Sequence, residues 1–307
     1  MITSFLWKLK GYSMLQIRCK TLPECGRLHG DARVVQQIHG PPKGGIGIHG
    51  GIYSQGKAIQ GTLGFVGALL KMIRAVSPSH VFVAFDGECE NVRTEIDGDY
   101  KANRPDYHDV PEEETPFSQL PDIFRALDYL GIRYRETECC EADDWIAGYA
   151  RRYGGDGDVV IASQDSDFFQ LITDRVHVLR YRGEQSTLCD PAYIRAKLGI
   201  DPCRYASYKS LTGDTADNIR GVEKVGPKTA AALLNQFRDV EDLIAHAGEI
   251  AKPSVRESVM NSTDRIRRNY ALIALSGESD LPFALEELAY TYTGITTTQV
   301  LAGIDLR

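Results

Sequence analysis

The sequence predicts an α/β fold, with a mostly parallel sheet that has helices on both faces and a helical part after it. Two continuous apolar runs, residues 81–85 and 158–163, carry this prediction, because such runs are typical of strands buried on both faces. Segments of helical periodicity separate them, and this alternation favours a parallel sheet. Carboxylates follow both runs: Asp86 comes after the first, and Asp165 and Asp167 come after the second. Ligands of open α/β sheets bind at that edge, so the acids indicate a site there.

Composition restricts the class of protein without identifying it. The chain has 307 residues and a formal net charge of −7, which leaves room for local basic patches that bind nucleic acid. No run approaches the 18 or so apolar residues of a membrane span. The seven cysteines form no repeating pattern, so we expect reduced thiols in a cytoplasmic protein.

The first 60 residues are the least informative and are expected to form a divergent or poorly ordered amino-terminal segment. Residues 40–51 are rich in glycine and proline and favour a loop. Residues 45–50 fit the dinucleotide pattern G-x-G-x-x-G, but Pro41 and Pro42 stand where the required strand would be. A nucleotide cofactor is therefore not expected.

From residue 61 the pattern becomes regular, and a catalytic α/β core is expected over residues 61–190. It would contain helices at 62–73, at 117–130 and from Glu141, and further strands at 132–137 and 176–181. Residues 88–115 are polar and charged, which indicates an excursion from the core. Beyond residue 190 the sequence predicts a helical subdomain over 191–307, with helices at 191–198, 205–211, 228–237, 240–247 and 263–275.

The acidic stretch at residues 140–145 is the centre of the site that we expect. Glu141 and Asp144 are spaced to share one helix face, although acids at a helix start are common in any protein. Carboxylates cluster in four places along the chain: Asp86; Glu141, Asp143 and Asp144; Asp165 and Asp167; and Asp214 and Asp217. Oxygen ligands without His or Cys suit Mg²⁺ or Mn²⁺, and crowded carboxylates need a cation. Two such metals would support hydrolysis of a phosphodiester bond.

A Gly-bounded turn follows the last pair of acids. It resembles a P-loop only superficially, because Pro227 interrupts the pattern and no strand precedes it. A turn between two helices can bind a phosphate through backbone N–H groups and a helix amino terminus, although a plain helix–turn–helix connection is the alternative. The candidate DNA-binding residues are Gly221, Val222, Lys224, Gly226, Lys228 and Thr229.

Together these motifs resemble the 5′-nuclease family, which comprises the 5′–3′ exonuclease domain of bacterial DNA polymerase I and the stand-alone phage-type flap endonucleases. The resemblance rests on residues 84–86, 100–104, 141–144, 163–167 and 213–219, followed by the Gly-Pro-Lys turn, and covers about residues 60–275. It implies a PIN-like core and a helix–hairpin–helix variant that holds duplex DNA, and a location in the cytoplasm of a bacterial or phage-infected cell. Since no polymerase domain follows, the stand-alone type is expected.

The resemblance also implies roles for individual residues. Asp86, Glu141, Asp143 and Asp144 match the first metal group, whereas Asp165, Asp167, Asp214 and Asp217 match the second. The arch of residues 88–115 would contribute Lys101 and Arg104 to the scissile phosphate of a 5′ flap, with Arg93 at its base. A K⁺ ion is expected at the hairpin turn in addition to two Mg²⁺ or Mn²⁺ ions.

One feature departs from the family pattern. The family opens with an apolar strand ending in Asp-Gly, which supplies another metal ligand, and nothing before residue 60 matches it. Asp31 is the candidate replacement. Otherwise the site is one carboxylate short, which would lower activity while leaving DNA binding intact.

Three functions remain open on these residues. The leading prediction is a metal-dependent, structure-selective 5′–3′ exonuclease or flap endonuclease of DNA replication or repair. The alternatives are a branched-DNA-binding protein with impaired cleavage and a PIN-type ribonuclease, the latter disfavoured by the Gly-Pro-Lys turn. The expected partner is DNA with a 5′ flap or 5′ end, and a monomer is the default.

Overall fold

The computed structural model describes residues 12–18, 52–54, 57–87, 92–103, 116–138, 140–278 and 280–306. Its centre is a six-stranded sheet of order β5-β4-β1-β6-β7-β8. The strands are β1 (Tyr12–Arg18), β4 (His80–Phe85), β5 (Arg133–Glu136), β6 (Asp158–Ala162), β7 (Val176–Arg180) and β8 (Thr187–Cys189). β4, β5, β6 and β7 run in one direction and β1 and β8 in the other, so the expected mostly parallel α/β sheet is confirmed.

β1 is the element that the sequence did not predict. It lies between β4 and β6 and is antiparallel to both, with Tyr12 opposite Phe85 and Arg18 opposite Asp158. Its carboxyl end therefore lies at the sheet edge opposite to Asp86. A ligand placed directly after this strand, as in the family pattern, would be on the wrong side of the sheet.

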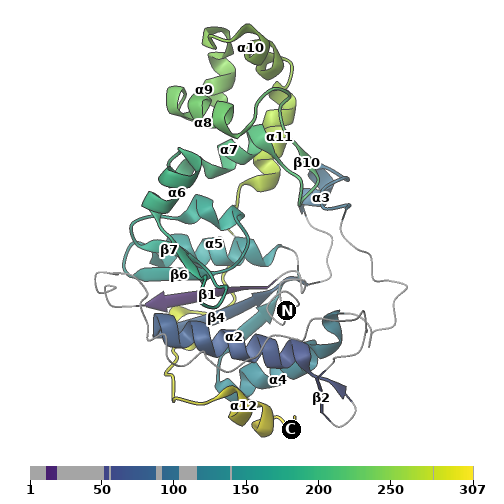
Figure 1. The fold of residues 1–307 in the computed structure, drawn as a ribbon, viewed down its shortest axis with the longest axis vertical. Coiled ribbons are helices and arrows are strands. Elements are labelled where there is room, and N and C mark those ends of the chain that lie inside the picture. The colour runs from purple at the N-terminus through teal and green to yellow at the C-terminus, as the bar shows by residue number, and fades with distance from the viewer. Residues whose placement is uncertain are drawn as a thin grey trace, which may run out of the picture.

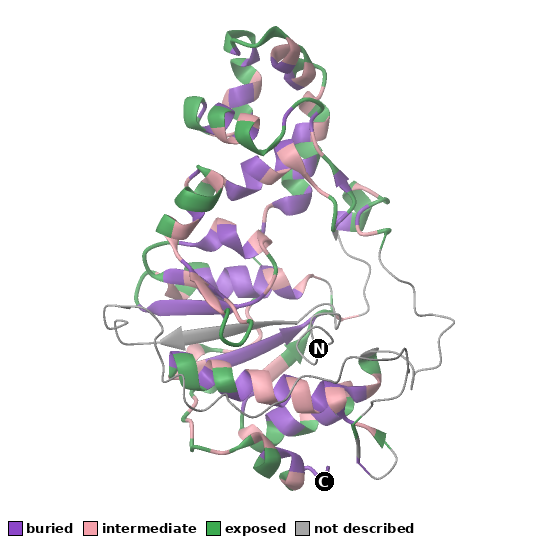
Figure 2. Cartoon of the chain, viewed as in Figure 1, coloured by how far each residue is buried: buried purple, intermediate pink, exposed green. Residues whose placement is uncertain are grey.

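The sheet has a hydrophobic core on each face, and the period of two along each strand explains both. Val81, Val83 and Phe85 of β4 pack with α2 (Gln60–Val76), α4 (Leu120–Leu130) and α12 (Thr297–Gly303). Phe82 and Ala84 point the other way and pack with α5 (Ala142–Tyr153). Helices thus cover both faces (Figure 1), and the strands between them are buried (Figure 2).

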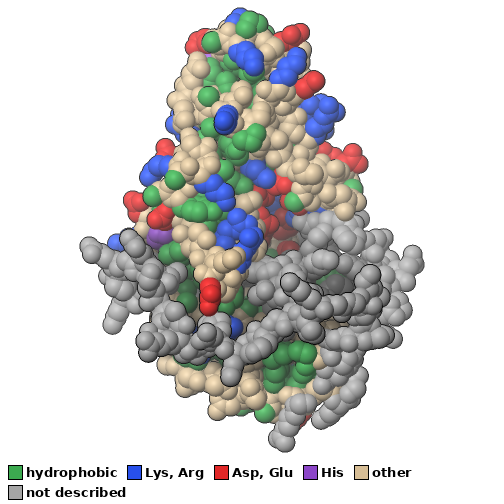
Figure 3. Space-filling view, viewed as in Figure 1, with side chains coloured by type: hydrophobic (Ala, Val, Ile, Leu, Met, Phe, Trp, Pro, Cys, Tyr) green, Lys and Arg blue, Asp and Glu red, His purple; other side chains and the backbone are tan. Residues whose placement is uncertain are grey.

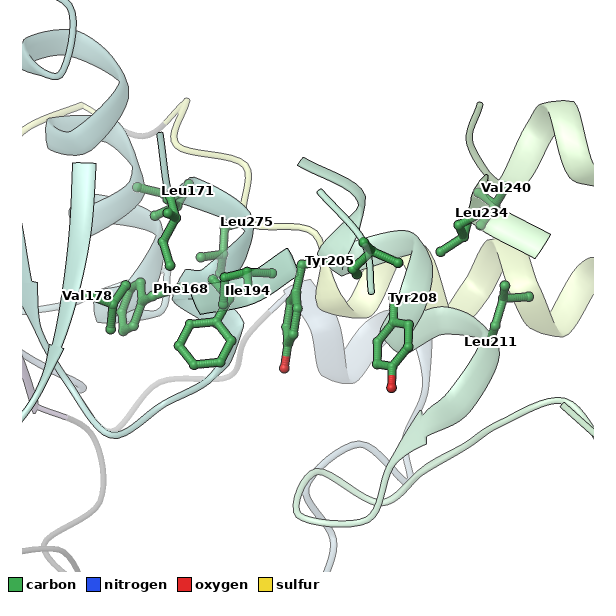
Figure 4. Packing of buried hydrophobic residues seen from close by; sticks show 14 of the residues in the cluster. Phe168, Leu171, Val178, Ile194, Tyr205, Tyr208, Leu211, Leu234, Val240 and Leu275 are labelled. Carbon is green, nitrogen blue, oxygen red and sulfur yellow. The ribbon is translucent and has the colours of Figure 1, made fainter. Parts of the chain in front are cut away.

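The core that contains Phe82 and Ala84 continues without a break into the helical part of the chain. Phe168 packs beside Val178 of β7, and the same cluster runs through Tyr205 to Leu211 and Leu234 (Figure 4). The helices of this part are α6 (Pro191–Leu198), α7 (Tyr205–Thr212), α8 (Pro227–Gln236), α9 (Val240–Ala245), α10 (Pro253–Met260) and α11 (Thr263–Ile273). Continuous packing of this kind holds the helical part in a fixed position relative to the sheet edge.

The remaining elements are short. They are β2 (Tyr53–Ser54), β3 (Lys57–Ala58), α3 (Val92–Ile96), β9 (Gly213–Asp214), β10 (Ile219–Arg220) and the 3₁₀ turns η2 (Pro116–Gln119), η3 (Asp167–Leu171), η4 (Pro202–Arg204), η5 (Ala247–Glu249) and η6 (Leu285–Leu288). Within the described ranges, no helix is long and apolar enough to cross a membrane. The segment 40–51, with its glycine pattern, lies outside the described residues.

Candidate active site

The ends of β4, β6 and β7 share one edge of the sheet, and three acid-bearing segments meet there. Asp86 follows β4 and accepts a hydrogen bond of 2.7 Å from the backbone N–H of Ala142, the first residue of α5. This bond places the amino terminus of α5, with Glu141 and Asp143, beside the end of β4. Asp165 and Asp167 follow β6 at the same edge. In Figure 3, acidic side chains gather in a recess in the middle of the molecule, with Lys and Arg side chains next to them.

Asp143 lies among the other carboxylates of this edge. Desolvation, followed by the charges of Asp165, Asp86 and Glu141, raises the pKa of Asp143 well above its usual range. Desolvation also raises the pKa of Asp165, as do the charges of Asp217 and Asp214. Asp165 therefore interacts with Asp143 of the first expected metal group and with Asp214 and Asp217 of the second. The eight carboxylates do not form two independent groups.

Asp167, Asp214 and Asp217 make the tightest cluster. One carboxylate oxygen of each lies within 4.8 Å of the others. Asp167 Oδ1 is buried and has no hydrogen-bond partner among the described residues. Burial and the charge of Asp165 raise the pKa of Asp167 well above its usual range, although Lys209 lowers it. Three convergent carboxylates with an unsatisfied buried oxygen are a donor set that fits a hard divalent cation.

The loop that carries Asp214 and Asp217 is held in place by close backbone contacts. Gly213 has φ of +80°, and a Cβ on Gly213 would lie 2.4 Å from the backbone nitrogen of Gly221. The two glycines let the ends of the antiparallel pair β9 and β10 approach to this short distance. The buried Asn269 of α11 donates to the carbonyls of Ser210 and Arg220, at 3.0 and 2.9 Å, and so ties both ends of the loop to α11.

Arg93 and Asp144 form a buried ion pair. The guanidinium donates to both carboxylate oxygens of Asp144, each at 3.0 Å, and to Glu141 Oε2 at 2.8 Å. Burial alone would lower the pKa of Arg93, but its contacts with Asp144 and Glu141 raise it. Glu141 directly precedes α5 and Asp144 lies in its first turn, and both contact Arg93. Arg93 Nε also binds the carbonyl of Leu272 at 2.9 Å.

The partners of this pair limit what each residue can do for a substrate. Asp144 Oδ1 also accepts from the backbone N–H of Ser276 at 3.1 Å, so both of its oxygens have protein partners. Arg93 joins α3, α5 and the end of α11. In this arrangement the bonds of Arg93 and Asp144 connect parts of the protein to one another.

Lys101 lies in the segment after α3, and its side chain reaches the acidic recess. Its ammonium group donates to Glu141 Oε1, and its backbone N–H binds the carbonyl of Asp217 at 3.0 Å. Lys101 has φ of +57°. Two further bonds join this segment to the acidic loop: Asn103 donates to the carbonyl of Thr215 at 3.0 Å, and Asn218 donates to that of Asp99 at 2.9 Å. The base of the expected arch is therefore fixed directly to the loop of Asp214 and Asp217.

The predicted Gly-bounded turn lies between β10 and α8. Val222 and Val225 are buried and anchor it, with a bond of 2.8 Å from the N–H of Val222 to the carbonyl of Leu211. Lys224 (φ +63°), Gly226 and Lys228 are exposed. Pro227 begins α8, so the free N–H groups of the first turn of this helix face solvent beside the two lysines. Val222 can contact a ligand only through its backbone.

Sequence reasoning missed the residues that join these parts. The side chain of Gln170 donates to the carbonyl of Ile273 at 3.1 Å and accepts from the N–H of Leu275 at 3.0 Å. Gln170, Asn269 and Ser276 tie the acid-bearing segments to α11 and the chain after it. Their signal in the sequence is weak, because each acts on a backbone group far away in the chain. Asp31 and Arg104 lie outside the described residues.

Comparison with known proteins identifies the family of the chain. Residues 49–199 match the family model of the 5′-3′ exonuclease N-terminal resolvase-like domain, and residues 200–294 match that of the 5′-3′ exonuclease C-terminal SAM fold. The thermostable DNA polymerase I of Thermus aquaticus is 34% identical over 235 residues, or 76% of this chain. The DNA polymerase I of Rhizobium leguminosarum is 34% identical over 243 residues. The chain spans only 27% and 23% of the lengths of these two relatives.

Solved structures with the same fold come from bacteriophage T5. A T5 protein co-crystallised with metal ions is 26% identical, with a TM-score of 0.61 over 69% of this chain and 81% of that chain. The zinc-bound T5 5′-exonuclease is 24% identical, with a TM-score of 0.60 over 69% of this chain and 80% of that chain. With both domain models matched in order along residues 49–294, the chain belongs to the 5′-nuclease family, an enzyme family of 5′–3′ exonucleases that includes flap endonucleases.

Proposed function

We propose that this protein is a structure-selective, metal-dependent 5′–3′ exonuclease and flap endonuclease that hydrolyses phosphodiester bonds of DNA in replication or repair. The observation that carries the proposal is the cluster of Asp167, Asp214 and Asp217 within 4.8 Å, next to Asp143 and Asp165. Such a set of oxygen donors has a high local negative charge that a divalent cation would neutralise.

The residues present fit two Mg²⁺ or Mn²⁺ ions. Asp167, Asp214 and Asp217 would hold one, and Asp86, Glu141 and Asp143 would hold the other, with Asp165 between them. Asp144 is omitted because it pairs through both oxygens with the buried Arg93, whereas Glu141 contacts Arg93 through one oxygen and Lys101, which would move to the phosphate, through the other. Metals bound there would activate a water molecule and stabilise the charge that develops on the phosphate.

The chain itself would orient the substrate. Lys101 contacts Glu141 at the amino terminus of α5, and its ammonium group would neutralise the scissile phosphate. Arg104 is proposed to act with it. Arg93 would act indirectly, since its buried bonds fix α3, from which the segment of Lys101 continues.

The Gly-bounded turn would hold the duplex at a distance from the reaction. Exposed N–H groups at the start of α8 and the ammonium groups of Lys224 and Lys228 are suited to a phosphate and read no base sequence. The carbonyl groups of such a turn also suit a K⁺ ion, which we include in the proposal. A fixed spacing between this turn and the acids would select DNA with a junction or a 5′ end.

A second candidate function is branched-DNA binding with impaired cleavage. The specific observation in its favour is the direction of β1, whose carboxyl end lies at the edge opposite to Asp86. A ligand directly after that strand would then lie away from the acids, and without a carboxylate from Asp31 the metal site would be one ligand short.

Cleavage of a labelled 5′-flap DNA, with single-stranded RNA as the competing substrate, tests the proposal. We expect Mg²⁺-dependent cutting near the junction and no cutting of the RNA. Tight binding of the flap with no cutting in Mg²⁺ or Mn²⁺ would favour the binding protein, and preferential cutting of the RNA would favour a PIN-type ribonuclease.

A further inference from the structure

Two arginines at the end of β7 lie at the same edge of the sheet as the acids, and the proposed function does not use them. β7 is parallel to β6, with Leu179 opposite Ala162. The N–H of Ser163 donates to the carbonyl of Leu179 at 3.2 Å, so this register continues past the end of β6. Arg180, the last residue of β7, and Arg182, in the turn after it, therefore lie beside the loop of Asp165.

Gln164 connects the turn to that acidic loop through three hydrogen bonds. Its side chain donates to the carbonyl of Tyr181 at 3.1 Å and accepts from Arg182 Nε at 3.1 Å. Its own carbonyl accepts from an Nη atom of Arg180 at 3.0 Å. Gln164 directly precedes Asp165. The two guanidinium groups are therefore bonded to the neighbour of a carboxylate that is proposed to lie at the metal site.

Both guanidinium groups keep donors that the protein does not use. Arg182 is exposed, and its bond to Gln164 is the one polar contact of its side chain within the described ranges. Arg180 is half-buried over the ring of Phe169, 5.7 Å from its centroid. Its Nε is buried and has no hydrogen-bond partner among the residues that the structure describes, so Arg182 offers the exposed donors of this pair. The turn is thus positioned to bind an anion, with a planar fork of donors that matches a phosphate.

The position of the turn distinguishes it from the other basic groups. Lys101 lies in the segment after α3 and contacts Glu141, and in Figure 1 α3 lies to the right of α5 whereas β7 lies to its left. A solvated surface arginine would bond to water alone, whereas Arg182 is bonded to Gln164, which also holds Tyr181 and Arg180 beside Asp165. A DNA strand lying across the acids would pass close to both flanks.

We propose that Arg182, supported by Arg180 and Gln164, binds a backbone phosphate of the DNA on the flank of the acidic site opposite to Lys101. The inference rests on the proposed function in that DNA is the ligand. It adds a contact that fixes the strand on both sides of the scissile bond. Because phosphate carries no sequence information, the contact would raise affinity without selecting bases.

The experiment uses the full chain and a labelled 5′-flap DNA, with binding measured in EDTA over a series of KCl concentrations. Arg182→Ala should weaken binding roughly three- to tenfold and reduce the slope of log Kd against log salt by about one. Arg182→Lys should keep most of the slope because it keeps the charge. The matched control is Arg175→Ala, since Arg175 is also exposed but precedes β7, at the opposite edge of the sheet. In Mg²⁺, the loss should fall on KM rather than on kcat.

The outcomes separate this proposal from the previous one. If Arg182→Ala binds and cleaves like Arg175→Ala while the wild type cuts the flap, the contact is refuted and the nuclease stands. If the wild type does not cut but Arg182→Ala still weakens binding and lowers the salt slope, the contact stands and the nuclease function is refuted.

Discussion

Replacement of Asp167 by Asn should stabilise the metal-free protein. In most buried positions the loss of a carboxylate partner destabilises a fold, but here the partners of Asp167 are other carboxylates. Asp167 Oδ1 has no hydrogen-bond partner among the described residues, so the substitution breaks no bond there. An amide would instead place donors beside Asp214 and Asp217.

The size of the effect follows from the spacing of the charges. At the 4.8 Å that encloses the three carboxylate oxygens, two unit charges repel by about 3.5 kcal/mol at an effective dielectric constant of ~20. The ion pair of Lys209 with Asp214 offsets part of this repulsion, and the raised pKa of Asp167 lets it escape by taking up a proton. A net gain of about 1–3 kcal/mol remains, which corresponds to a rise in Tm of roughly 2–10 °C.

The pH dependence has a definite sign. Since the pKa of Asp167 is higher in the folded than in the unfolded protein, the folded state binds more protons between these two values. The free energy of unfolding of the wild type therefore falls as pH rises from the ordinary aspartate range through the raised pKa. The advantage of Asp167→Asn should be small at acid pH and largest above the raised pKa.

Thermal unfolding in EDTA and in Mg²⁺ at several pH values checks this reasoning. Mg²⁺ should raise the Tm of the wild type more than that of Asp167→Asn, because the cation relieves the same repulsion. Asp174→Asn, at an exposed position at the other edge of the sheet, serves as the control. A lower Tm for Asp167→Asn in EDTA, or an equal gain from Mg²⁺ in both proteins, would refute the reasoning.

Three further outcomes follow from the contacts around the acids. Arg93→Ala should lower the free energy of unfolding by about 3–5 kcal/mol, because it leaves the buried Asp144 charge unpaired. Urea titration measures this free energy, and a loss below about 1 kcal/mol would contradict the buried pair. Lys101→Ala should lower kcat about 10²-fold or more in single-turnover cleavage while the Tm in Mg²⁺ stays close to that of the wild type, and an unchanged kcat would exclude a role at the phosphate. Gln170→Ala should lower the free energy of unfolding by about 1–3 kcal/mol and weaken the Mg²⁺ dependence of Tm, because the carbonyl of Ile273 and the N–H of Leu275 lose their partner. Gln170→Glu should retain only the bond that it accepts from Leu275. Full stability of both variants would contradict the connection.

Local patterns predicted much of the fold. The apolar runs at 81–85 and 158–163 are strands because both faces of the sheet are covered, and residues 191–198 form a helix with the expected bounds. β1 was missed because its residues, Tyr12–Arg18, mix polar and apolar types with no clear period. Its pairing partners lie more than 60 residues away in the chain, and only such long-range pairing identifies it as a central strand.

In the site, as in the fold, local patterns predict some features and long-range contacts determine the others. Oxygen-rich motifs identified the acids, but the spacing of Glu141 and Asp144 could not tell which of them faces the recess. That depends on Arg93 and on Ser276, and Ser276 is 132 residues from Asp144. The bond from Arg93 to Leu272 spans 179 residues, a contact that no local motif encodes. Residue types therefore predicted the chemistry, and tertiary contacts decide which carboxylates remain for a metal.

Cleavage of a labelled 5′-flap DNA in Mg²⁺ and in EDTA, by the wild type and by Asp165→Asn, tests the central claim most directly. Asp165 interacts with both groups of acids, and its loss should disable the whole site while flap binding persists. We expect cutting near the junction by the wild type in Mg²⁺, none in EDTA, and a loss of at least ~10²-fold in Asp165→Asn. Cutting that persists in EDTA, or an Asp165→Asn variant as active as the wild type, would contradict a nuclease built on these carboxylates.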